Sequence, residues 1–71
     1  MNLTDLDKAI LLCLAQGMQS KEIAACVGRK KPTVELHIRL LLAKMNARSR
    51  AQLVAIAMER REINLPLEAT G

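Results

Sequence analysis

Phosphate-binding side chains are concentrated between Lys21 and Arg50. This stretch holds eight lysines and arginines but only two acids, Glu22 and Glu35, so its net charge is +6, whereas that of the whole chain is +4. Lysine and arginine neutralise the phosphates of nucleic acids, and the counterions released favour association. The charge distribution therefore predicts a polyanionic partner for this stretch, and it leaves the flanking segments slightly acidic.

The sequence indicates no catalytic or metal-binding chemistry. His37 is the only histidine, with no acid–nucleophile arrangement around it and no second ligand of its kind, so we expect it to pack or to contact a phosphate. Cys13 and Cys26 are widely spaced and match neither a disulfide framework nor a zinc pattern. We expect both to be buried and reduced in a cytosolic protein. The chain is thus predicted not to be an enzyme and to need no cofactor or metal.

The amino-acid composition narrows the choice of polyanion. The chain contains no Phe, Tyr or Trp, and single-stranded nucleic acids are normally held by stacking bases on such rings. Duplex DNA needs only cations for its phosphates and polar or apolar tips for its base edges. No apolar run approaches the roughly 18 residues of a membrane span, and Asp5 and Asp7 replace the positive charge of an export signal. We therefore expect a cytoplasmic protein that binds double-stranded DNA and no membrane.

An all-α fold is predicted, because Leu and Ala are abundant and β-branched residues are few. The 71 residues allow one domain with a small core. Thr4, Ser20 and Ser49 are expected to be helix N-caps, and Gly17 and Asn46 to end helices in the left-handed conformation. We place the helices at about 5–16, 21–27, 31–46 and 50–61, within a domain of residues 1–62. Residues 63–71 form a C-terminal tail with Pro66, docked by Ile63 and Leu65 or frayed.

The second and third of these helices show the spacing of a helix-turn-helix. Ala24 is small enough for the next helix to cross closely, and Gly28 supplies the positive φ of a tight turn. Val34 then packs the second helix back onto the first, a pattern typical of this motif. A helix-turn-helix with concentrated positive charge predicts a reader of duplex DNA.

From Leu3 to about Met58 the sequence resembles the DNA-binding domain of the LuxR/FixJ/GerE family of bacterial transcription regulators. The resemblance implies a four-helix domain, whose third helix enters the major groove and whose fourth helix forms the dimer contact on an inverted repeat. The matching segments occur in order and without a gap: Leu3-Thr4, Leu14-Ala15-Gln16-Gly17, Lys21-Glu22-Ile23-Ala24, Gly28, Thr33-Val34, His37, Lys44-Met45 and Arg48-Ser49-Arg50.

The resemblance also implies a role for individual residues. The base-reading positions fall on Glu35, Leu36 and Arg39. The expected phosphate contacts are Lys21, Thr33, Lys44 and Arg50, with Lys30 and Lys31 adding charge at the start of the third helix. The expected dimer interface consists of Leu53, Val54, Ala57 and Met58.

Two alternatives stay open at these positions. The family usually has Lys or Arg at Glu35 and a small or polar residue at Leu40. Glu35 is able to accept a hydrogen bond from cytosine N4 or to pair with Arg39, and Leu36 is able to contact a thymine methyl. Leu36 and Leu40 also share a helix face that suits a protein partner.

The sequence is therefore compatible with two functions. The first is a sequence-specific, homodimeric transcriptional regulator that binds duplex DNA. The second is a protein-interaction module or anti-activator that binds a partner regulator through its first and fourth helices. The second is motivated by Glu35, Leu36 and Leu40 on the surface that would face the groove. It is also motivated by Leu6, Leu12 and Cys13, which extend the apolar surface of the first helix and either pack within the domain or meet a partner.

Overall fold

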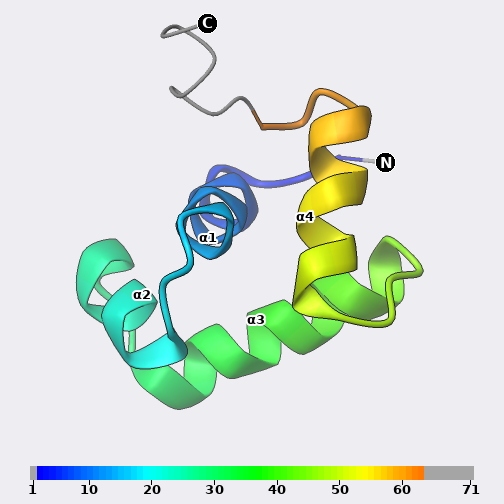
Figure 1. The fold of residues 1–71 in the computed structure, drawn as a ribbon. Coiled ribbons are helices and arrows are strands. Elements are labelled where there is room, and N and C mark those ends of the chain that lie inside the picture. The colour runs from blue at the N-terminus through cyan, green and yellow to red at the C-terminus, as the bar shows by residue number, and fades with distance from the viewer. Residues whose placement is uncertain (1, 64–71) are drawn as a thin grey trace, which may run out of the picture.

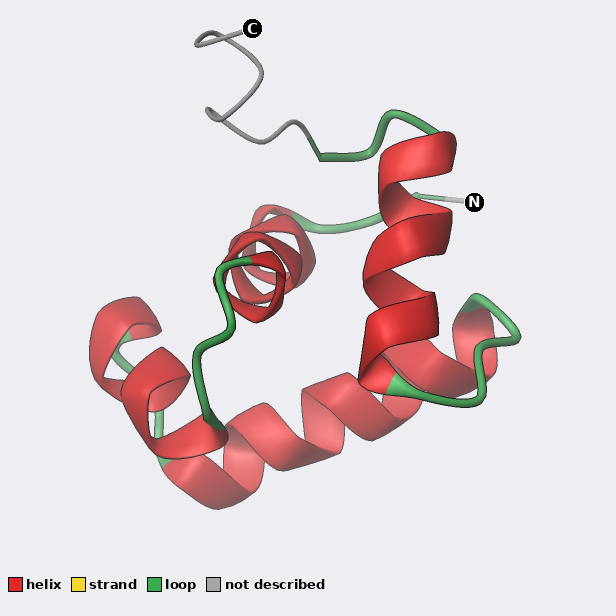
Figure 2. Ribbon diagram, viewed as in Figure 1, coloured by secondary structure: helices red, strands yellow, loops and turns green. Residues whose placement is uncertain are grey.

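Four helices joined by short loops make up most of the described chain (Figure 2). They are α1 (Asp5–Ala15), α2 (Ser20–Val27), α3 (Lys31–Lys44) and α4 (Arg50–Glu59). The computed structural model describes residues 2–63, and this range contains no strand. The all-α prediction is confirmed, whereas the expectations for Leu65 and Pro66 lie outside the described residues.

Helix α3 forms one side of the domain, and the other three helices lie against it (Figure 1). Its N-terminal part packs on α2 and its C-terminal part lies near α4, while α1 lies between α2 and α4 and contacts all three of the others. One face of α3 is therefore enclosed by the domain, and none of the helices in residues 2–63 lies over the opposite face.

The core is formed by residues from every helix and from the segment after α4. At the centre, α3 buries Val34, Ile38 and Leu41 at spacings of three and four residues, which is the period of one helix face. The remaining buried apolar residues are Ile10, Leu11, Ile23, Ala24, Met45, Leu53, Ala57 and Ile63. Because Ile63 is part of the core, the chain continues to pack against the domain beyond the end of α4.

Two of the three expected N-caps are confirmed. The Asp7 N–H donates to Thr4 Oγ1 at 3.0 Å and the Thr4 N–H donates to Asp7 Oδ2 at 3.1 Å, which makes a capping box. Ser49 Oγ accepts from the Gln52 N–H at 3.1 Å. The prediction for Ser20 is wrong: α2 begins at Ser20 itself, and the N-cap is the preceding residue, whose N–H donates to the Glu22 carboxylate.

All four helices end in the same way, with a residue in the left-handed conformation. Gly17, Gly28 and Asn46 have φ values of 82°, 70° and 54°, as the sequence indicates, and Arg61 has a φ of 59°. After each, the next N–H donates to the carbonyl five residues back, for example Ala47 N to Leu42 O at 2.8 Å. Helix α4 therefore ends at Glu59, earlier than expected, because the chain turns out of the helix at Arg61.

The additional apolar residues of α1 belong to the domain interior. Leu6, Leu12 and Cys13 are partly buried and pack against the core. The pKa of the Cys13 thiol is raised, first by its burial and second by the neighbouring Cys26 thiol, which keeps Cys13 protonated at neutral pH. The expectation that Cys26 is buried is wrong, because Cys26 is exposed. Helix α2 buries Ile23 and Ala24 in the core, and Cys26 lies outside this buried face. Both cysteines are free thiols.

Candidate nucleic-acid interface

The outer face of α3 is the most distinctive surface of the described domain. Leu36 and Leu40 are 49% and 54% exposed, and they are the only exposed large hydrophobic residues among residues 2–63. Arg39 lies between them in the sequence and is also exposed. These side chains point away from the core because they lie opposite Val34 and Leu41 on the helix. Two of the three expected base-reading residues, Leu36 and Arg39, are thus exposed.

Glu35, the third expected base-reading residue, is half-buried at the edge of this face. It lines two adjoining surface hollows, one shared with Arg39 and Arg50 and the other with Lys21 and Lys31. Within residues 2–63, none of these cations approaches Glu35 closely enough to form an ion pair. Arg39 is therefore not held by Glu35, and its guanidinium remains available to a partner.

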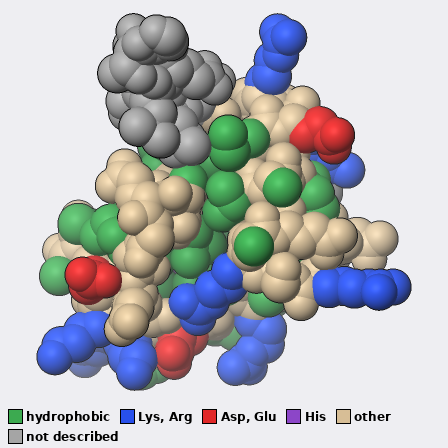
Figure 3. All heavy atoms as spheres, viewed as in Figure 1, with side chains coloured by type: hydrophobic (Ala, Val, Ile, Leu, Met, Phe, Trp, Pro, Cys, Tyr) green, Lys and Arg blue, Asp and Glu red, His purple; other side chains and the backbone are tan. Residues whose placement is uncertain are grey.

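The expected phosphate-binding residues come together from three helices. Lys21 lies on α2, Lys31 begins α3 and Arg50 begins α4, and all three are exposed. Lysine and arginine side chains accordingly gather on the part of the surface where α3 lies (Figure 3). Of the other expected contacts, Lys30 and Lys44 are exposed at the two ends of α3, and Thr33 is half-buried. The fold places cations from segments distant in sequence together beside Glu35, at one edge of the outer face of α3, and other cations lie at the ends of this helix.

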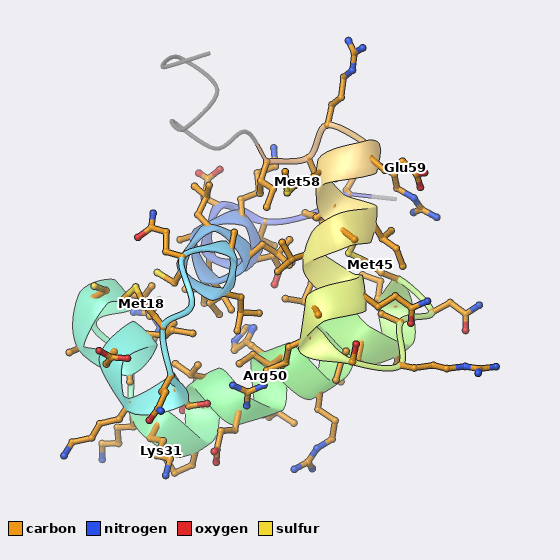
Figure 4. All side chains as sticks on the ribbon, in the orientation of Figure 1. Met18, Lys31, Met45, Arg50, Met58 and Glu59 are labelled. Carbon is orange, nitrogen blue, oxygen red and sulfur yellow. The ribbon has the colours of Figure 1, made fainter. Side chains whose placement is uncertain are left out.

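Arg50 also makes a contact within the domain that the sequence did not predict. Its Nη2 donates to Ser20 Oγ at 3.2 Å, and Ser20 is only 5% exposed. The side chain extends from the start of α4 toward α2 (Figure 4). It therefore links the first turns of α2 and α4. Because Arg50 and Ser20 are 30 residues apart in the sequence, no local sequence pattern predicts the contact.

His37 likewise has a partner that the sequence did not reveal. Its Nδ1 lies 3.7 Å from Asp7 Oδ1, and Asp7 is 6% exposed, the one buried acid among residues 2–63. The other carboxylate oxygen of Asp7 accepts the N-cap hydrogen bond from Thr4. His37 of α3 therefore lies beside the first turn of α1. A capping acid in the first helix and the lone histidine of the third are the signals that together suggest this contact.

The expected dimer interface requires a correction. Leu53 and Ala57 have no exposed surface, because they pack α4 against the core, and so they are not able to contact a second copy of the chain. Val54 and Met58 are partly exposed on the same helix. Only these two of the four expected residues retain surface for such a contact.

A metal centre and a membrane-spanning helix are both absent from the described part of the chain. Residues 2–63 contain no group of three or more His, Cys, Asp or Glu that would hold a metal ion. None of the described helices has the length and hydrophobicity needed to span a membrane.

Comparison with known proteins points to one family. The family described as "Bacterial regulatory proteins, luxR family" matches residues 1–57. The chain is 39% identical over 59 residues to the nitrate/nitrite response regulator protein NarP of Escherichia coli (strain K12), which covers 83% of this chain and 27% of that protein. It is 38% identical over 58 residues to a nitrate/nitrite response regulator protein homolog of Haemophilus influenzae, which covers 82% and 28%. No solved structure matches the chain.

The chain spans about a quarter of the length of these two relatives. The family match covers α1, α2, α3 and most of α4, that is, the helices that place the outer face of α3 among the cations. The family consists of DNA-binding regulators and not of enzymes. The chain belongs to the LuxR family of bacterial regulatory proteins and is a helix-turn-helix DNA-binding domain of that family.

Proposed function

We propose that this domain binds duplex DNA sequence-specifically and acts as a transcriptional regulator. Its proposed location is the bacterial cytoplasm, at the nucleoid when it is bound to DNA. One observation carries the proposal: the outer face of α3 is uncovered and is flanked by exposed cations from α2, α3 and α4. An α-helix of this kind fits the major groove, and cations on either side reach the phosphates that border the groove.

The base-reading residues in this proposal are Glu35, Leu36 and Arg39. Arginine recognises guanine through O6 and N7, and glutamate accepts a hydrogen bond from cytosine N4. Because Glu35 and Arg39 are adjacent on the helix but unpaired in the described structure, each is free to bond to a base edge. The proposed phosphate contacts are Lys21, Lys30, Lys31, Thr33, Lys44 and Arg50. The absence of aromatic rings argues against single-stranded nucleic acid as the ligand.

A homodimer on an inverted repeat is the proposed assembly. A two-fold axis through the exposed side of α4 would bring Val54 of each copy, and Met58 of each copy, into contact across the interface. The names of the two relatives describe response regulators. We extend a regulatory role to this chain, and not the signal to which those proteins respond.

The proposal is tested by measuring affinity for duplexes selected from a randomised pool and for an unrelated duplex of equal length. For Arg39→Ala, the preference for the selected duplex is expected to fall by at least about fivefold, because a bidentate contact to a base discriminates by about 1–3 kcal/mol. Lys44→Ala, the matched control, is expected to weaken both duplexes equally, since phosphates carry no sequence information. Full retention of sequence preference by Arg39→Ala would refute this assignment.

One of the two observations behind the alternative of a protein-interaction module, the additional apolar surface of α1, no longer favours it. The additional apolar residues of α1, Leu6 and Leu12, pack against the core. The exposed leucines lie on α3 and not on α1 or α4. Absence of any gel shift with random or genomic duplex, even at low salt, would nevertheless favour this alternative over DNA binding.

A further inference from the structure

Two exposed leucines on the outer face of α3 need an explanation beyond a basic DNA-binding surface. Leu36 and Leu40 each leave about half of their surface in water, whereas the other large apolar residues of the described domain are at least partly buried. They lie one helical turn apart, so their side chains are neighbours and form one apolar strip. We call Leu36 and Leu40 the leucine strip.

The leucine strip is longer than one base-pair step and shorter than two. Side chains at positions i and i+4 have Cβ atoms about 5–6 Å apart, and successive base pairs of B-DNA are about 3.4 Å apart along the helix axis. Two leucines on a helix that lies in the groove therefore reach two neighbouring base pairs. Arg39, which adjoins both leucines on α3, reaches the same region.

The charge around the leucine strip decides between DNA and a protein as its occupant. Lys30 and Lys31 are exposed at one end of α3 and Lys44 at the other, and the one acid on α3, Glu35, lies at the edge of the face. A partner must therefore be polyanionic and must also offer apolar groups. The major groove has both properties, because phosphates line it and the C5-methyl group of thymine projects into it.

We propose that Leu36 and Leu40 together contact the C5-methyl groups of thymines on two neighbouring base pairs of each half-site. This inference rests on the proposed DNA-binding function and makes it more specific. It assigns a specificity-determining role to Leu40, one turn beyond Leu36. It also specifies part of the base sequence that the outer face of α3 would recognise, namely two adjacent A·T pairs beside the bases that Arg39 and Glu35 contact.

The experiment begins with duplexes that the 71-residue chain selects from a randomised pool. Each selected half-site is expected to contain two neighbouring A·T pairs. Replacing one of these thymines by deoxyuridine removes only the methyl group and leaves base pairing unchanged. In one half-site this substitution is expected to weaken binding about fourfold, the effect of removing one buried methyl group. Deoxyuridine at thymines outside the half-site is the DNA control and is expected to have no effect.

Protein variants assign each methyl group to its leucine. At one of the two thymine positions, the Leu40→Ala variant is expected to bind the thymine duplex and the deoxyuridine duplex with equal affinity. Leu36→Ala is expected to do the same at the other position. The reason is that once the leucine is gone, removing the methyl group that it contacts has no further effect. Leu40→Met keeps a large apolar side chain, so its affinity is expected to remain sensitive to the replacement of thymine by deoxyuridine. Both leucines are exposed, so all variants should melt close to the parent chain, and the melting temperature verifies this.

Each other outcome is decisive. If the chain retains no duplex from the pool, the proposed function fails and this inference fails with it. If duplexes are selected but deoxyuridine has no effect, or has the same effect on Leu40→Ala as on the parent chain, DNA binding stands and the thymine contact is refuted. In that case the leucine strip would be left for a protein partner.

Discussion

The residues that end the four helices are defined by a left-handed backbone conformation, and not all of them are residue types that favour it. Arg61 has a φ of 59°, a conformation that costs a residue with a side chain about 1–2 kcal/mol, yet it ends α4 with the same hydrogen bond that follows the glycines. Asn46 has a similar φ but is better suited to it, because asparagine tolerates this region. The sequence indicated the glycines and the asparagine, whereas nothing about an arginine signals a helix end.

Arg61→Gly is expected to stabilise the domain. Glycine removes the steric cost at positive φ, and its greater flexibility in the unfolded chain offsets part of the gain, so the free energy of unfolding should rise by about 0.5–1 kcal/mol. The control is Arg60→Gly, which removes the same side chain at a φ of −83° and should lower the stability. Chemical denaturation measures both. Equal effects of the two substitutions would contradict a special role for the conformation of Arg61.

At the level of elements, contacts between helices hold α3 in place. The Asp7 carboxylate closes the first turn of α1 and also faces His37 of α3. Arg50, at the start of α4, donates to Ser20 at the start of α2. The second contact joins two of the helices that supply cations beside the outer face of α3. It therefore contributes to the relative positions of these helices, on which the placement of their cations depends.

The Arg50–Ser20 contact is expected to contribute to stability as a pair. Ser20→Ala should cost about 1–3 kcal/mol, because the hydroxyl is buried and accepts a hydrogen bond from a charged group. In a double-mutant cycle with Arg50→Ala, the coupling energy should be at least about 0.5 kcal/mol. Ser49→Ala removes a cap of similar chemistry and serves as the control, with a cost of about 1 kcal/mol and no coupling to Ser20. Additive effects of Ser20→Ala and Arg50→Ala would show that the contact is absent in solution.

The whole molecule separates the two sides of α3 into a structural side and a binding side. Val34, Ile38 and Leu41 hold the helix to the core, and the opposite face is left to the partner. Cations come from α2, α3 and α4, so no single helix carries the basic surface. This arrangement makes affinity for DNA a property of the assembled domain and not of α3 alone.

Affinity for DNA is expected to fall steeply with salt. A dimer that binds six or more phosphates should lose affinity on the order of a thousandfold between about 50 and about 200 mM salt, because released counterions drive binding. Replacing Lys30 by alanine should make the slope of log affinity against log salt shallower by about one for each phosphate that Lys30 neutralises. Cys26→Ala, at an exposed neutral position on α2, should leave the slope unchanged. A salt-independent affinity would argue against phosphate binding as the source of affinity.

Dimer formation is expected to depend on the exposed side of α4. Met58→Gln keeps the length of the side chain but replaces its apolar end with a polar one, so affinity for a full inverted repeat should fall about tenfold while affinity for a single half-site stays the same. Leu53→Ala should instead unfold the marginally stable domain or weaken it by about 2–5 kcal/mol, because it opens a cavity in the core. Equal effects of Met58→Gln on the full repeat and on the half-site would rule out this contact.

The sequence by itself determined the helices, the turn and the location of charge, because these depend on neighbouring residues. Thr4, Gly28 and Asn46 mark helix ends through local hydrogen bonds and φ preferences, and the spacing of Val34 and Ile38 defines the inner face of α3. Nearly the whole fold was therefore predictable, with helix ends in error by one or two residues.

Only the tertiary structure decided which apolar and polar residues have partners. Leu53 and Val54 are adjacent in the sequence and equally apolar, yet one is in the core and the other is partly exposed. The contacts of Arg50 with Ser20 and of His37 with Asp7 join residues that are close only after the chain folds. Periodicity reports which side of a helix is apolar, whereas burial depends on where the other helices lie. The shared helix face of Leu36 and Leu40 was evident from the sequence, whereas the exposed fraction of each side chain depends on where the other helices lie.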